Sequence, residues 1–499
     1  MRIDCDELRR RTPSGFLARV RLVFVLFAAG LAASCASVEA PPVKAKASAS
    51  VASPRTTGGP AVNSERKRLI ELFGGEYSAP ASERFLNGIL TRLAPASETP
   101  TEPYRVTILN SPIVNAFALP SGDIFVTRGL LALANDASEV AAVMAHEIAH
   151  VTARHAAQRA ELEKTAALFS KVSTDVLARP DESQQVEAKM RLTIAHFSRE
   201  QEFEADKIGI KVIAKAGYDP YAAARFLELL GRSTALRASL LGQNASSERP
   251  DMMSTHPSTP ERVAKAISEA RQIGAPGIGE DGREAYLSAI DGIAFGDDPS
   301  EGLVRGVRFV HPKLGFAFAA PEGFVLENQS AALIGVGEGG AVALRLDSVA
   351  ADDAAGPEGM IASGWIDGLK TGSVEKLTIN DLPAATAMAQ GEQWSFRLGA
   401  IRLGAKVYRL IFAARGLTPA VDARFIASIK SFHRLSPDEI AGARPLRVSV
   451  VAPTASDTLE TLAQRMAIAD RPLDHFMLLN GLEKGARLNP NLRYKVIVE

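Results

Sequence analysis

Two histidines and a glutamate stand at a spacing that suits metal-dependent hydrolysis, because residues 146–150 read His-Glu-Ile-Ala-His. On a helix, His146 and His150 lie one turn apart on the same face, about 6 Å along the axis, so both rings can bind one Zn²⁺. Glu147, beside the first histidine, is placed to polarise a water held by that metal. The pattern therefore predicts a hydrolytic zinc site.

The residues before this motif predict the helix that it needs. Asp136 offers an N-cap oxygen, Glu139 follows as the carboxylate of a capping box, and residues 140–145 contain neither Gly nor Pro. The alternative is an ordinary polar helix face. Because the helix is otherwise small and apolar, these three polar side chains would be costly to bury unless a metal or hydrogen bonds satisfied them.

A catalytic zinc needs a third protein ligand and an open fourth position. The metzincin pattern is excluded, because Ala153 and Ala156 stand where it requires Gly and His. Downstream, Glu202 and Asp206 are one turn apart on a strongly helical stretch. One of them could bind the metal while the other accepts the free ring N–H of a zinc histidine. The alternative is a solvated acidic face paired with nearby lysines.

The chain resembles the CAAX prenyl protease and HtpX-like metallopeptidases, which are gluzincins, in particular their soluble periplasmic, BepA-like branch. The matching motifs occur in the family's order, across roughly residues 64 to 275, at residues 115–122, 129–131, 146–151 with 154–155, 202–206 and 256–262. The resemblance implies one Zn²⁺ per chain on His146, His150 and Glu202, with Glu147 as the base. It implies that Asp206 contacts a ligand without touching the metal. Ser121 stands where the family usually has Gly.

Two further residues are candidates for catalysis. Thr259-Pro260 is typical of an N-cap followed by Pro at the first helical position, which places Arg262 in the first turn, where a cation opposes the helix dipole. Facing the zinc, Arg262 could stabilise the oxyanion of an attacked peptide. His256 could donate a hydrogen bond to that oxyanion or act as a reversible fourth ligand, as soluble periplasmic relatives suggest. The alternative for both is a polar surface turn.

The other histidines are not candidate ligands. His155 lies five residues after His150, so on a continuous helix it faces another side and is expected to meet solvent or pack locally. The remaining ones are isolated in apolar surroundings: His196, His311, His433 and His475.

A short run between two prolines predicts the substrate-binding strand. Residues 113–120 suit an edge strand, with residues 123–127 as its neighbour. An edge strand beside a zinc site can bind an extended peptide through main-chain hydrogen bonds. The expected substrate contacts are Asn115, Ala116, Phe117 and Ala118. The alternative, ordinary sheet packing, is compatible with the same residues.

Residues 1–35 are typical of an export signal, with a basic start, an apolar core too short to span a membrane and small residues up to Cys35. Leu31-Ala32-Ala33-Ser34-Cys35 resembles a bacterial lipoprotein cleavage site, so Cys35 is the expected lipidation site; the alternative is a plain secretory signal. Cys5 would leave with the signal. Residues 36–62, rich in Ala, Ser, Pro, Lys and Gly, predict a disordered tether.

The remaining sequence predicts an α+β protein with three folded parts. Residues 63–275 form a mostly helical zincin-type metallopeptidase domain with a small edge-strand sheet, and residues 231–255 could be a mobile loop over its cleft. Residues 276–304, rich in Gly, Asp and Pro, are typical of a linker. Residues 305–435 predict a small α+β domain without a catalytic cluster. Residues 446–499 resemble a LysM module, a βααβ unit that binds N-acetylglucosamine polymers.

The sequence as a whole favours an envelope protease. Its 499 residues carry 57 basic and 57 acidic side chains, so no field favours nucleic acid, and no nucleotide fingerprint appears. We expect a zinc endopeptidase in the periplasm, lipid-anchored to the outer membrane, that cleaves misfolded or stalled envelope proteins. The LysM-like module could contact peptidoglycan. The alternatives are a chaperone or scaffold with a latent zinc site, and a cell-wall hydrolase.

Overall fold

The computed structural model describes residues 60–161, 164, 197–241, 251–329, 331–352 and 355–499. The predicted signal, the lipidation site at Cys35 and nearly all of the predicted tether lie outside the described residues. The sequence also predicts a long helix from about residue 184 to residue 216, and the first part of this range lies outside the described residues. Among the described helices, none combines the length and apolar character needed to cross a bilayer.

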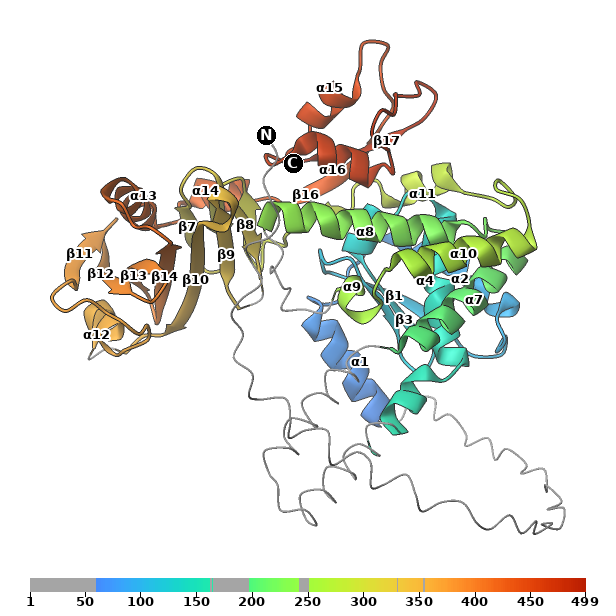
Figure 1. Ribbon diagram of the computed structural model, residues 1–499, viewed down its shortest axis with the longest axis horizontal. Coiled ribbons are helices and arrows are strands. Elements are labelled where there is room, and N and C mark those ends of the chain that lie inside the picture. The colour runs from blue at the N-terminus through green and yellow to red at the C-terminus, as the bar shows by residue number, and fades with distance from the viewer. Residues whose placement is uncertain (1–59, 162–163, 165–196, 242–250, 330, 353–354) are drawn as a thin grey trace, which may run out of the picture. The chain divides into compact units, whose positions relative to one another are not determined.

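Helices dominate the region that carries the zinc motif, around one small sheet (Figure 1). The helices are α1 (Pro60–Leu72), α2 (Pro80–Ala96), α3 (Arg128–Leu133), α4 (Ala137–Thr152), α7 (Arg199–Lys215), α8 (Ala222–Leu241), α9 (Met252–Thr255), α10 (Pro260–Ile273) and α11 (Arg283–Ile290). The strands are β1 (Arg105–Leu109), β2 (Ala116–Ala118) and β3 (Asp123–Thr127). The prediction of an α+β protein with a mostly helical zincin-type domain is confirmed.

The motif helix α4 begins as its sequence predicts. The Asp136 carboxylate accepts a hydrogen bond from the Glu139 backbone N–H at 2.8 Å, and the Glu139 carboxylate accepts one from the Asn135 N–H at 2.8 Å. These bonds satisfy N–H groups that a helix start leaves unpaired. Every residue from Ala137 to Val151 is buried, so α4 is a central helix rather than a surface one.

The small sheet has three strands, with β2 at one of its two edges. Its order is β1-β3-β2, with β1 parallel and β2 antiparallel to β3. β2 is therefore an edge strand beside α4, which it contacts. This agrees with the predicted pairing of residues 113–120 with residues 123–127.

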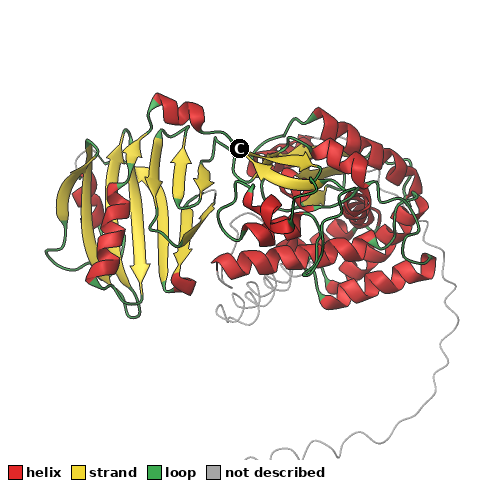
Figure 2. Cartoon of the chain, turned by 90° about the horizontal axis from the view of Figure 1, so that it is seen from above, coloured by secondary structure: helices red, strands yellow, loops and turns green. Residues whose placement is uncertain are grey.

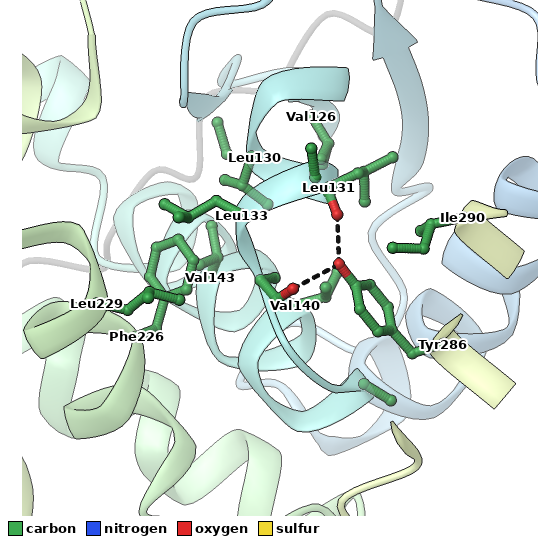
Figure 3. Close-up of a cluster of buried hydrophobic side chains, with 14 of the residues drawn as sticks. Val126, Leu130, Leu131, Leu133, Val140, Val143, Phe226, Leu229, Tyr286 and Ile290 are labelled. Carbon is green, nitrogen blue, oxygen red and sulfur yellow. Dashed lines mark hydrogen bonds between the residues drawn. The ribbon is translucent and has the colours of Figure 1, made fainter. Parts of the chain in front are cut away.

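A continuous apolar core surrounds α4 (Figure 3). It joins side chains of β3, α3, α4, α8 and α11, among them Val126, Leu130, Val143 and Phe226. Tyr286 of α11 is fully buried in it, and its hydroxyl donates to backbone carbonyls at the end of α3, including Ala134 O at 2.8 Å. The core thus fixes α3 and α4 from several directions.

Two segments differ from the sequence expectations. Of the predicted loop 231–255, residues up to Leu241 continue α8 and Met252–Thr255 form α9; residues 242–250 lie outside the description. The predicted linker 276–304 contains α11, whose Tyr286, Leu287 and Ile290 are fully buried. Its many Gly and Asp residues flank this short helix, and the few apolar ones between them pack into the core.

The middle region forms a β-rich unit (Figure 2). A seven-stranded sheet has the order β11-β12-β13-β14-β10-β9-β8, and a four-stranded sheet has the order β15-β7-β6-β5. Successive strand residues point to opposite faces, and the apolar side chains of α12 (Gly356–Ala362) and α13 (Pro419–Lys430) belong to different clusters on those faces. The two helices therefore cover opposite faces of the larger sheet.

The strands of this unit are β5 (Leu303–Arg305), β6 (Arg308–His311), β7 (Phe316–Ala319), β8 (Phe324–Asn328), β9 (Leu333–Gly337), β10 (Val342–Ala350), β11 (Glu375–Ile379), β12 (Leu382–Gln390), β13 (Ser395–Leu403), β14 (Lys406–Ala414) and β15 (His433–Arg434). A 3-10 turn, η1 (Glu338–Gly340), joins β9 to β10, and α14 (Pro437–Gly442) follows β15.

The C-terminal segment has the predicted βααβ order and shares its core with the zinc-motif region. Its elements are β16 (Leu446–Val451), α15 (Leu459–Gln464), α16 (Pro472–Leu479) and β17 (Tyr494–Val498). β16 also pairs with β4 (Ala294–Phe295), which lies in the predicted linker. Apolar side chains of this segment and of α4 belong to one buried cluster. The segment is therefore packed as part of that region rather than as a separate module.

Candidate metal centre

Four buried side chains from three segments converge at the motif. His146 and His150 come from α4, Glu202 from α7 and His256 from the residue that ends α9. One potential ligand atom from each lies within 4.8 Å of the others. The structure thus brings together the three predicted metal ligands and adds the histidine that was predicted as a possible fourth.

The distances within this group fit a tetrahedral ion. The Nε2 atoms of His146 and His150 are 3.0 Å apart, and His256 Nδ1 lies 3.3 Å from His146 Nε2. The carboxylate of Glu202 lies 3.0 Å from His256 Nδ1 and 3.5 Å from His150 Nε2. Ligands about 2.0–2.1 Å from a tetrahedral Zn²⁺ are roughly 3.3 Å from one another. The four side chains therefore fit the corners of one zinc site.

The charges of the centre also favour the binding of a cation. In the described part of the chain, Glu147, Glu202 and Asp206 are buried beside one guanidinium, that of Arg262. Burial alone would lower the pKa of His146, but the carboxylates of Asp206 and Glu202 raise it to about 10. Positive charge is thus favoured where the ligand atoms meet, and a divalent ion would supply it.

Close packing of α7 against α4 brings Glu202 near the two histidines of the motif. α7 packs against α4, and α10 packs against α7 and α8 (Figure 1). A Cβ atom on Gly209 would lie 3.2 Å from the backbone N of His146, so only a glycine allows the two helices to approach this closely without adjustment. α7 begins at a full capping box between Ser198 and Gln201, which fixes the turn that holds Glu202.

Asp206 and Arg262 form a network behind the ligands. Asp206 Oδ1 lies 3.0 Å from His146 Nδ1, the ring nitrogen that does not face the other ligands, as predicted for an acceptor of the free ring N–H. The Arg262 guanidinium makes two hydrogen bonds to Asp206, at 2.8 and 2.7 Å, and its Nη1 lies 2.7 Å from Glu202 Oε2. The predicted cap at Thr259 and Pro260 is present.

The contacts of Arg262 thus differ from those expected of a residue that stabilises an oxyanion. Its guanidinium is already engaged by both carboxylates and by the Pro257 carbonyl at 3.0 Å. Such contacts hold Glu202 and Asp206 in position. The oxyanion role stays a prediction, and the position in the first turn is explained by the two acids that it faces.

Glu147 lies where a general base is needed. It is buried, its Oε1 atom is 3.6 Å from His256 Nε2, and its carboxylate accepts a hydrogen bond from the Ala118 backbone N–H. Burial raises the pKa of Glu147 above the ordinary value of a glutamate. A raised pKa suits a group that first takes a proton and later gives it away.

The edge strand β2 contacts Glu147 through the backbone N–H of Ala118. The Thr127 N–H donates to Asn115 O, and the Leu119 N–H donates to Asp123 O, so alternate peptide groups of β2 face β3. Ala116 and Ala118 then present theirs to the open edge. Phe117 instead stacks on Phe125, with ring centroids 5.0 Å apart. Of the four predicted substrate contacts, Ala116 and Ala118 have the expected orientation.

His155 differs most from its prediction. It is fully buried, and its Nδ1 lies 2.8 Å from His150 Nδ1. Arg154 adopts a left-handed backbone conformation, with φ of 60°, which ends α4 and starts a new helical stretch at residue 155. The spacing argument assumed one continuous helix. Arg154, a basic residue two positions after the end of α4, gave no sign of this break in the sequence.

Comparison with known proteins places the centre within a matched region. Residues 80–270 match the family described as peptidase family M48. The β-barrel assembly-enhancing protease of Escherichia coli (strain K12) is 31% identical over 218 residues, which cover 42% of this chain and 43% of that protein. The mitochondrial metalloendopeptidase OMA1 of Arabidopsis thaliana is 39% identical over 168 residues, or 34% of this chain and 31% of that protein.

The chain thus spans less than half the length of these curated relatives. The resemblance drawn from the motifs is confirmed for residues 80–270, which contain the whole centre. The solution structure of cyanobacterial PsbP from Synechocystis covers 26% of this chain at 12% identity, with a TM-score of 0.22, and bears on no function. The LysM-like assignment of residues 446–499 stays a prediction.

Proposed function

We propose that this chain, which carries a peptidase family M48 domain in residues 80–270, is a zinc-dependent endopeptidase of the bacterial cell envelope. The observation that supports it most is the meeting of His146, His150 and Glu202 within reach of one ion, with Glu147 beside them. All are buried at the edge strand, where an extended polypeptide could lie.

The mechanism assigns each side chain a task. Zn²⁺ on His146, His150 and Glu202 would supply Lewis-acid chemistry, which acidifies water and polarises a carbonyl. Glu147 takes the proton of the attacking water and passes it to the leaving amine. Arg262 and Asp206 hold the ligands in place. The peptide groups of Ala116 and the carbonyl of Ala118 align the substrate backbone, so recognition depends on an extended conformation more than on side chains.

The proposed substrates are unfolded or misassembled envelope polypeptides. One relative's name, β-barrel assembly-enhancing protease, supports an envelope role. Backbone recognition at an edge strand suits chains that have lost their fold. We place the enzyme in the periplasm, lipid-anchored through Cys35, and extend its possible partners to peptidoglycan through residues 446–499.

Zinc removal tests the proposal directly. The purified protein should contain one Zn²⁺ per chain and cleave unfolded casein; a chelator should abolish cleavage, and added Zn²⁺ should restore it. Muropeptide release from purified cell wall should stay at background. Cleavage that persists without metal would contradict the proposal. Muropeptide release without casein cleavage would favour the cell-wall hydrolase, and zinc binding with neither activity would favour the chaperone or scaffold.

His256 fills the position that a catalytic zinc must leave open, so its removal should activate the enzyme. We expect His256→Ala to raise casein cleavage severalfold and to weaken zinc binding moderately, measured as kcat and as zinc affinity. His433→Ala, a histidine of the middle region that bonds to Glu439, is the control and should change neither. A fall in kcat for His256→Ala would instead indicate an oxyanion donor.

A further inference from the structure

The two metal histidines are supported in different ways on the side away from the ion. His146 Nδ1 faces the carboxylate of Asp206 directly, at 3.0 Å. Among the described residues, none places a carboxylate on that side of His150; its Nδ1 faces the ring of His155, at 2.8 Å. His155 Nε2 in turn lies 3.3 Å from Glu204 Oε2. A second histidine thus stands where a metal ligand usually finds an acceptor.

The chemistry of the centre fixes the proton on each ring nitrogen. When His150 Nε2 binds a metal, the neutral ring carries its proton on Nδ1, so Nδ1–H donates toward His155. His155 Nδ1 must then accept, and its own proton lies on Nε2. That N–H points toward the Glu204 carboxylate, which can only accept when ionised. His150, His155 and Glu204 therefore each have the donor or acceptor role that these contacts require.

The local backbone is arranged to create this contact. The left-handed conformation of Arg154 costs energy for a residue other than glycine and ends α4 immediately before His155. The break turns His155 back toward His150, where it is fully buried. On the other side, Phe197 stacks on His150 with ring centroids 3.9 Å apart and an interplanar angle of 25°. The His150 ring is therefore contacted by both aromatic neighbours.

We infer that His155 is a positioning residue that holds His150 in the tautomer and orientation needed to bind zinc. The inference rests on the proposed function in that it assumes a metal at this centre. His155 itself touches neither the ion nor the substrate. Its contribution should therefore be visible in metal affinity, whether or not the protein cleaves a given substrate.

Two substitutions distinguish the effect of the hydrogen bond that His155 accepts from the effect of its packing. His155→Leu fills the space but removes the acceptor. His155→Asn places a side-chain oxygen near the position of Nδ1 and keeps it. Zinc affinity is measured by competition with a chromophoric chelator, and the thermal unfolding of the metal-free proteins reports on the fold. His433→Leu, away from the centre, is the matched control.

We expect His155→Leu to weaken zinc binding about 10–100-fold, the usual effect of losing such a partner. His155→Asn should stay within about threefold of the unmodified protein, because the acceptor is retained. kcat should fall more than KM changes in the leucine variant at limiting zinc.

Equal zinc affinity of His155→Leu and the unmodified protein would overturn the inference. So would an equal loss in both variants while the metal-free asparagine variant unfolds at the unmodified temperature. If the unmodified protein binds zinc tightly but cleaves nothing, the proposed function fails, and the comparison of affinities still decides the role of His155.

Discussion

Replacing Glu147 by glutamine should lower kcat/KM for an unfolded polypeptide by about 10²–10⁴-fold while leaving zinc bound. Glutamine keeps the size of the side chain and an oxygen that can accept from the Ala118 N–H. It cannot take a proton from water. Glu147 also lies outside the group of four potential ligands, so the metal should remain in place.

Zinc content and casein cleavage, measured on the same preparation, check this result. Glu228→Gln makes the same chemical change at an exposed position of α8 and should leave both values unchanged. If Glu147→Gln retains zinc and cleaves casein at the normal rate, proteolysis is not the task of this site. The chaperone or scaffold would then be the better account.

Replacing Lys495 by methionine should destabilise the protein by about 3 kcal/mol, since each buried carbonyl left without a partner costs roughly 1–3 kcal/mol. The Lys495 ammonium is fully buried in β17 and donates to the carbonyls of Ala132 at 2.9 Å, Leu133 at 3.2 Å and Ala134. These carbonyls end α3, just before the cap of α4. Burial lowers the pKa of Lys495 to about 7, against the opposing effect of the nearby Glu139 and Asp136 carboxylates.

Denaturant unfolding of the metal-free protein measures this effect. Lys484→Met, an exposed lysine of the same C-terminal segment, is the control and should change stability little. Because residues 446–499 share a core with α4, the Lys495 variant should lose the whole M48 domain in one earlier transition. A separate early transition that leaves that domain folded would contradict the shared core.

The sequence predicted the metal ligands of the centre better than the residues that hold those ligands in position. His146, His150 and Glu202 could be found because ligand spacing on a helix is a local pattern, and the caps of α4 and α10 follow from single residues. His155 could not, because a single backbone rotation at Arg154 redirects it. The engagement of Arg262 by two acids depends on the packing of α10 against α7, which no local pattern encodes.

The domain organisation was harder to predict from the sequence, for a related reason. Gly- and Asp-rich composition suggested a linker at residues 276–304, but burial of a few apolar residues decides whether a segment packs, and α11 supplies them. Likewise, the polarity of residues 231–241 concealed the end of α8. The βααβ order of the C-terminal segment was visible in the sequence, whereas its pairing with β4 was not.

The contact of Lys495 with Ala132 joins residues 363 positions apart. Contacts this distant in sequence form late, since a long loop must close first. During synthesis, a chain that has emerged only as far as the middle region has every metal ligand yet lacks the strand that anchors the turn before the motif helix. The motif helix therefore gains its full set of native contacts only after β17 has been made.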